Sequence, residues 1–129
     1  MKTGEPTPEV LEERLLDFSV RVGKVVDALP DTRLGRHIAG QLVRCGTSPG
    51  ANYSEACVAE SKRDFIHKLG ITFKELRESR HWIRIIIKGA LLPGKKMHPL
   101  LDEVDQLLRI IAKSIITAKA NRTKSEIRK

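Results

Sequence analysis

Hydrophobic residues recur every three or four positions through most of the chain, which is the spacing of α-helices with one buried side. The longest uninterrupted run extends from Ser61 to Ala90 and contains no proline. At ~100° per residue, one broad side of this run forms a predicted core stripe. The stripe consists of Phe65, Leu69, Thr72, Phe73, Leu76, Ser79, Ile83, Ile86, Ile87 and Ala90. The pattern predicts a long helix that packs against several neighbours.

The same rhythm predicts four helices, over about residues 8–29, 32–59, 62–91 and 98–120. Connections this short between long helices force consecutive helices to run antiparallel. We therefore expect an all-α fold, an up-and-down antiparallel four-helix bundle that forms one domain over residues 1–120. The basic stretch 121–129 is expected to be a flexible tail.

Glycine and proline interrupt the second helical pattern at Gly46-Thr47-Ser48-Pro49-Gly50. A proline inside a helix removes one backbone hydrogen bond and usually bends the helix. Either one helix bends and continues, or it ends and a new helix starts with Ser48 as its cap. Earlier in the same pattern, Gly35, Ala39 and Gly40 are small enough to let a neighbouring helix approach closely.

A second apolar cluster on the third helix lies away from the core stripe. It contains Ile71, Trp82 and Ile85, with Glu75 and Glu78 among them. A helix with a single buried side does not account for such a cluster. Tryptophan is enriched in subunit interfaces, so these five residues are predicted to form an oligomer interface. Packing of Trp82 against the second helix is the alternative.

Composition agrees with a single helical domain. The chain has 129 residues, and only 4% of them are aromatic, which disfavours β-sheets. Two cysteines are too few for a disulfide framework, and no segment approaches eighteen uninterrupted apolar residues. We expect a cytoplasmic protein that makes no membrane contact.

The charge balance is strongly basic, with 24 lysines and arginines against 16 acidic residues and a formal charge of +8. Such a balance favours polyanionic partners, although it also improves solubility. On the third helix, one sector carries basic side chains and no acidic residue. These are Arg63, Lys74, Arg77, His81, Arg84 and Lys88. They extend over about 38 Å of helix, and the sector is predicted to bind RNA or DNA phosphates, with a merely solvated surface as the alternative.

Candidate chemistry is otherwise sparse. The four histidines are spread over different predicted helices, and no nucleophile elbow, P-loop or paired Glu-x-x-His pattern is present. No catalytic residue, metal site or cofactor is expected, and the protein is predicted not to be an enzyme. An enzyme would require a composite site around Glu75, Glu78 and His81 of adjacent subunits.

Two segments carry a resemblance to a known family. The segments Arg44–Ala56, RCGTSPGANYSEA, and Lys62–Trp82, KRDFIHKLGITFKELRESRHW, resemble the four-helix-bundle proteins encoded in intervening sequences of bacterial 23S ribosomal RNA genes. The resemblance extends from about Phe18 to Ala120. It is densest at Thr47, Ser48, Ala51, Asn52, Glu55, Ala56, Phe65, Leu69, Lys74, Glu75, Glu78 and Trp82.

The resemblance implies a bundle that assembles into a homo-oligomeric ring, a homopentamer, with no known enzymatic activity. It also implies one continuous helix through Pro49, although the family usually has a branched aliphatic residue there. Accessory proteins of diversity-generating retroelements are similar in architecture, which makes a nucleic-acid-processing protein a further expected partner. The motif residues Ser48, Asn52 and Glu55 are expected to be structural, with Asn52 and Glu55 hydrogen-bonding across helices.

The leading hypothesis is thus a non-enzymatic, oligomeric helical bundle that binds nucleic acid through the third helix and the basic tail. The competing hypothesis is a protein-interaction scaffold or accessory subunit that does not bind nucleic acid directly.

Overall fold

The chain folds into four α-helices in the computed structural model, which describes residues 5–128 and the side-chain surroundings of residues 5–122. The described residues contain no strand. The helices are α1 Pro8–Ala28, α2 Arg33–Cys57, α3 Lys62–Lys88 and α4 Gly94–Arg128. The side chains of Thr7, Thr32 and Ser61 cap the first three helices by accepting hydrogen bonds from backbone N–H groups in the first turn.

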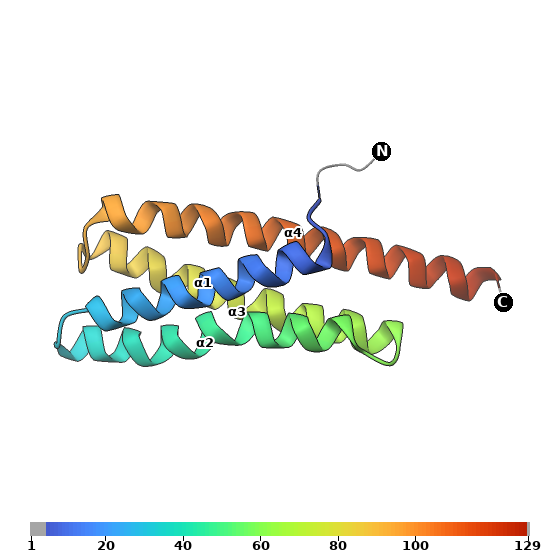
Figure 1. Ribbon diagram of the computed structural model, residues 1–129, viewed down its shortest axis with the longest axis horizontal. Coiled ribbons are helices and arrows are strands. Elements are labelled where there is room, and N and C mark those ends of the chain that lie inside the picture. Colours follow the sequence, from blue (N-terminus) through green and yellow to red (C-terminus); the bar gives the residue numbers. More distant parts are fainter. Residues whose placement is uncertain (1–4, 129) are drawn as a thin grey trace.

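The helices form the predicted up-and-down bundle. Helix α2 packs between α1 and α3, and α4 packs mainly on α3 and closes the bundle against α1. Figure 1 shows the long helices side by side, with the α1–α2 and α3–α4 connections at one end. The α2–α3 connection, the start of α1 and the end of α4 lie at the other end (Figure 1). Helix α3 therefore contacts α2 along one flank and α4 along the other, and its third side faces outward.

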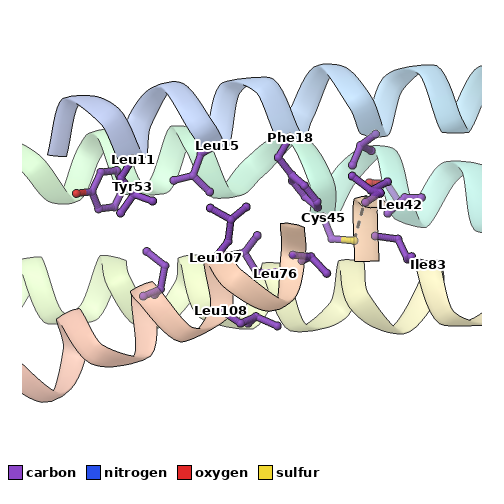
Figure 2. Close-up of a cluster of buried hydrophobic side chains, with 14 of the residues drawn as sticks. Leu11, Leu15, Phe18, Leu42, Cys45, Tyr53, Leu76, Ile83, Leu107 and Leu108 are labelled. Carbon is purple, nitrogen blue, oxygen red and sulfur yellow. Dashed lines mark hydrogen bonds between the residues drawn. The ribbon is translucent and has the colours of Figure 1, made fainter. Parts of the chain in front are cut away.

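The buried residues follow the helical spacing of hydrophobic positions in the sequence. Leu15, Phe18 and Val22 of α1 are fully buried, and Figure 2 shows Leu15 and Phe18 pointing toward Leu107 and Cys45 of the opposite helices. On α3 the stripe is buried at Leu69, Thr72, Leu76, Ser79, Ile83 and Ile86. Phe65, Phe73 and Ile87 at its margins are partly buried. The remaining stripe residue, Ala90, is exposed because α3 ends before it.

Helix α2 is continuous through Pro49, so the alternative of a helix that ends and restarts at Ser48 is wrong. Gly46 and Gly50 face α1 at this point. A Cβ atom on Gly46 would lie only 2.7 Å from Val22 Cγ1, and one on Gly50 would lie 3.6 Å from Leu15 Cβ. These glycines let α1 and α2 approach closely.

The expectation that Gly35 and Gly40 provide the close helix approach is wrong. A Cβ atom on Gly40 would meet nothing within 4 Å, and one on Gly35 would meet the Pro30 carbonyl of the preceding connection. The close contact between α1 and α2 thus lies at the Gly46–Gly50 segment, whose sequence is typical of a turn.

Helix α3 ends in a Schellman motif. The Leu91 N–H donates to the Ile86 carbonyl at 3.0 Å, and the Ala90 N–H donates to the Ile87 carbonyl at 3.0 Å. Ala90 has a φ of 54° at the position where glycine is usual. Gly89 precedes this residue as the C-cap, with a φ of −83°.

Helix α4 is longer than the sequence predicts. It begins at Gly94, contains Pro99 and continues to Arg128, so the predicted start near residue 98 and end near Ala120 are wrong. The stretch expected to be a flexible tail is helical as far as Arg128, and Lys129 lies outside the described residues.

The two cysteines differ in environment. Cys45 is buried in the core and Cys57 is exposed at the end of α2. Burial raises the pKa of the Cys45 thiol to about 11 against a weaker opposing hydrogen bond with Ser79. Burial also raises the pKa of Cys57. Both thiols are therefore protonated at neutral pH.

Candidate nucleic-acid interface

The outward side of α3 carries all six residues of the predicted phosphate-binding sector. Arg63, Lys74, Arg77, His81, Arg84 and Lys88 are each exposed, and we call them the basic face. No lysine or arginine side chain of the basic face forms a hydrogen bond or salt bridge with another described residue. Their charges are thus available to a ligand.

Cations on the flanks of the bundle are used differently. Arg80 donates to Asp105 across the α3–α4 seam, and Lys68 pairs with Glu55 across the α2–α3 seam. Arg14 of α1 donates to Glu103 of α4 at 2.8 Å. These three cations therefore join helices, whereas the lysines and arginines of the basic face pair with no described side chain.

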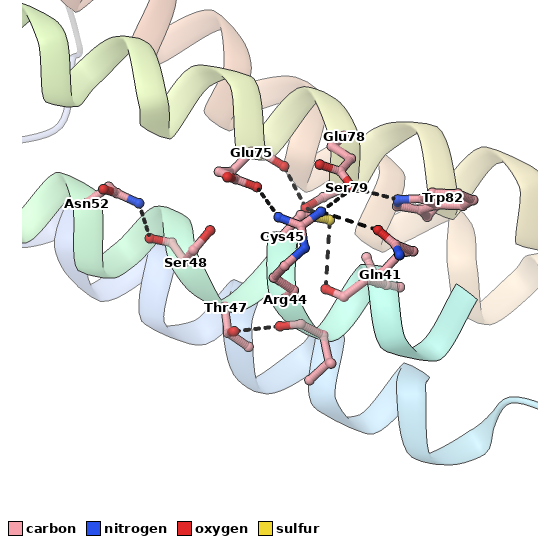
Figure 3. Close-up of polar contacts among 12 residues, drawn as sticks. Gln41, Arg44, Cys45, Thr47, Ser48, Asn52, Glu75, Glu78, Ser79 and Trp82 are labelled. Atoms are coloured by element: carbon pink, nitrogen blue, oxygen red, sulfur yellow. Dashed lines mark hydrogen bonds and ion pairs between the residues drawn. The ribbon is translucent and has the colours of Figure 1, made fainter. Parts of the chain in front are cut away.

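Arg44 of α2 bridges Glu75 and Glu78 of α3 in a cluster shown in Figure 3. One guanidinium nitrogen lies 3.3 Å from Glu75 Oε1, and the other contacts Glu78 Oε2. Trp82 Nε1 donates to the same Glu78 oxygen at 3.2 Å. Hence the two glutamates predicted to lie in an oligomer interface have a partner within their own chain.

The pKa of Glu78 reflects this cluster. Partial burial raises it, but hydrogen bonds from Arg44 and Trp82 and the charge of Arg44 together lower it, and the net pKa lies below the ordinary value. The pKa of Arg44 is raised, chiefly by its hydrogen bond to Glu78. Both groups stay charged at neutral pH, so Arg44 holds the negative charge of α3 on the α2 flank, away from the basic face.

Trp82 also lies within the α2–α3 seam, which is the alternative that the sequence left open. Its ring makes edge contacts with His37 of α2, at 5.5 Å between centroids, and with His81, at 5.1 Å. Ile71 and Ile85, the other apolar members of the predicted interface, are half-buried. The second apolar cluster therefore forms the α2 flank of α3 and leaves part of these side chains exposed.

A hollow of about 670 Å³ opens at the C-terminal third of α3, beside α4. We call it the α3–α4 hollow. Its lining consists of His81, Arg84, Ile85, Ile87, Lys88, Gly89 and Leu101. The basic face thus includes a concave segment with aliphatic side chains among the cations.

The Ser48, Asn52 and Glu55 motif lies on α2. Glu55 pairs with Lys68 of α3, in agreement with the expected cross-helix role. The Asn52 amide instead donates to the Ser48 carbonyl of its own helix at 3.1 Å (Figure 3). The prediction that Asn52 forms a hydrogen bond across helices is therefore wrong. The Ser48 hydroxyl has no hydrogen-bond partner among the described residues.

Arg44, His37 and Leu101 were not among the predicted site residues. Each belongs to a helix other than α3, and only the register between helices identifies its partner. Within residues 5–128, no three His, Cys, Asp or Glu side chains are grouped so that they could hold a metal ion. No helix in the same range is long and apolar enough to cross a membrane.

Comparison with known proteins identifies the family. A family model described as the 23S rRNA-intervening sequence protein matches residues 11–113. A crystal structure of a protein of unknown function from the S23 ribosomal protein family of Bacteroides thetaiotaomicron is similar, with a TM-score of 0.77 and 28% sequence identity. The match covers 84% of this chain and 96% of that one. A search of curated proteins gives no match. The chain belongs to the 23S rRNA-intervening sequence protein family.

Proposed function

We propose that this 23S rRNA-intervening sequence protein is a non-enzymatic, homo-oligomeric bundle that binds RNA or DNA phosphates through the basic face of α3. The observation that carries the proposal is that Arg63, Lys74, Arg77, Arg84 and Lys88 are exposed and have no side-chain partner among the residues that the structure describes. Unpaired cations arranged along one helix can each replace a counterion on a phosphate backbone.

Reversing two central charges is expected to weaken nucleic-acid binding. The double variant Arg77→Glu/Arg84→Glu should bind RNA or duplex DNA about tenfold more weakly at low salt, because it loses two phosphate contacts. For the same reason, its slope of log K against log salt should be about 2 shallower than that of the wild type. Fluorescence anisotropy across a salt series measures both quantities.

The matched control is Lys24→Glu/Arg33→Glu, which changes net charge equally on exposed positions of α1 and α2. This control should keep the wild-type slope. Weak, salt-insensitive binding that is the same for the wild type and the Arg77→Glu/Arg84→Glu variant would contradict the proposal.

A second candidate function, a protein-interaction scaffold, is supported by the outer surface of α1 and α2. Leu16 and Val20 of α1 are 58% and 56% exposed. A groove of about 600 Å³ beside Leu16 is rimmed by Glu9, Glu12 and Glu13. An apolar surface with an acidic rim suits a basic partner protein, for example one that processes nucleic acid. A complex that survives nuclease and high salt would favour this candidate.

The assembly that we propose is a homo-oligomeric ring, a pentamer as the family resemblance implies, with Ile71, Trp82 and Ile85 at the subunit contact. Half-buried aliphatic side chains beside a tryptophan support this assignment. The adjacent Glu75 and Glu78 are neutralised by Arg44, which reduces their repulsion of a second subunit.

Substitution of Trp82 by glutamate is expected to lower the oligomer mass while the chain stays helical. The new carboxylate would lie beside Glu78 and would have to be buried in a subunit contact without a partner. Light scattering gives the mass and circular dichroism gives the helix content. His37→Ala removes one intrachain contact of Trp82, leaves the Trp82 side chain in place and should keep the mass. An unchanged mass for Trp82→Glu would place the subunit contact elsewhere.

A further inference from the structure

The α3–α4 hollow combines two kinds of lining that a phosphate backbone alone does not require. Ile87 and Leu101 are half-buried and provide an aliphatic wall on the α4 side, while half-buried Ile85 lies on the opposite flank of α3. His81, Arg84 and Lys88 are exposed around it. The lining contains no acidic side chain. A ligand that fills the hollow therefore has an apolar part and an anionic part next to each other.

The position of the hollow narrows the class of ligand. It lies within the basic face, at the C-terminal end of α3, so a nucleic-acid strand on Arg63, Lys74 and Arg77 would reach it.

A duplex cannot use such a hollow, because its bases are stacked inside the helix and it presents phosphates and sugars to a helix surface. An unpaired nucleotide presents both a phosphate and a flat, largely apolar base. Proteins hold unstacked bases by stacking them on aromatic rings or guanidinium planes, and the lining supplies the His81 ring and the Arg84 guanidinium beside the aliphatic wall.

We infer that the basic face binds single-stranded nucleic acid, with one unpaired base in the α3–α4 hollow and the flanking phosphates on Arg84 and Lys88. The inference rests on the proposed function and specifies its ligand. Gly89 lines the hollow and has no side chain that would take up space there. A Cβ atom on Gly89 would lie 3.1 Å from the Ile85 carbonyl oxygen. The remaining cations of α3 hold the backbone of the same strand.

The test compares a labelled single-stranded oligopyrimidine RNA with a blunt duplex of the same length at one salt concentration. The wild-type protein should bind the single strand about tenfold more tightly, which corresponds to the contact of about one base. Ile87→Gln and Leu101→Gln each remove part of the aliphatic wall without a change of charge. Both should lose this preference and keep the duplex affinity.

The matched control is Ile115→Gln, which makes the same kind of substitution at a half-buried position of α4 outside the hollow. It should keep the preference for the single strand. Light scattering on every variant separates loss of a base contact from loss of assembly.

Three results would overturn the inference. Equal affinity of the wild type for both RNAs would overturn it and leave the proposed function in place, whereas binding to neither RNA would remove both. A lower oligomer mass for Leu101→Gln, with the single-strand preference intact in Ile87→Gln, would show that a second copy of the chain occupies the hollow.

Discussion

Leu15→Ala is expected to lower the free energy of unfolding by about 2–5 kcal/mol, the range for a leucine removed from a well-packed core. Leu15 is 0% exposed and lies against Gly50 of α2, where the two helix backbones are close. Because the close approach leaves neighbouring atoms little room to collapse into the cavity, the loss should fall in the upper half of this range. Urea unfolding followed by circular dichroism measures the change.

The adjacent residue provides the control. Leu16 is 58% exposed, so Leu16→Ala should change the free energy of unfolding by less than about 0.5 kcal/mol. A large loss for Leu16→Ala together with a lower oligomer mass would instead identify the outer surface of α1 as a subunit contact. Similar small effects of both substitutions would contradict the packing of α1 described above.

Gly46→Ala is expected to destabilise the bundle by about 1–3 kcal/mol, although alanine has the higher helix propensity. The added methyl group would lie 2.7 Å and 2.8 Å from the two Cγ atoms of Val22. Val22 is fully buried and its β-branched side chain is stiff, so it cannot rotate away. Helices α1 and α2 must separate to make room.

Gly40→Ala serves as the control on the same helix. A Cβ atom there meets nothing within 4 Å, so the substitution should stabilise the protein by about 0.5–1 kcal/mol through helix propensity alone. Thermal unfolding of the two variants should therefore shift in opposite directions. A gain in stability for Gly46→Ala would show that the two helices lie further apart than the structure has them.

The helices and the core could be predicted because both depend on patterns within one segment. Spacing alone identified Leu69, Leu76 and Ile83 as core residues. The Gly46–Gly50 run was ambiguous for the same reason. Glycine and proline have the same local preferences in a turn as in a closely packed helix, and only the presence of Val22 and Leu15 opposite distinguishes the two.

The surroundings of the site depend on the register between helices, which spacing within one helix does not reveal. Trp82 lies between the core stripe and the outer side of α3, so its angular position fits a subunit contact and the α2 seam equally well. Within one chain, the contact of Trp82 with His37 and the salt bridge of Arg44 with Glu78 place Trp82 in the α2–α3 seam. The basic face was easier to predict, because all of its residues belong to one uninterrupted helix.

The different surroundings of the two cysteines provide a way to count the chains of an assembly. Cys57 is exposed, whereas Cys45 is buried and has a pKa of about 11. Because a maleimide dye must reach the sulfur to react with it, mild labelling of the native protein places one dye on each chain, at the exposed Cys57. The number of photobleaching steps in single assemblies then equals the number of subunits, and no cysteine has to be added or removed.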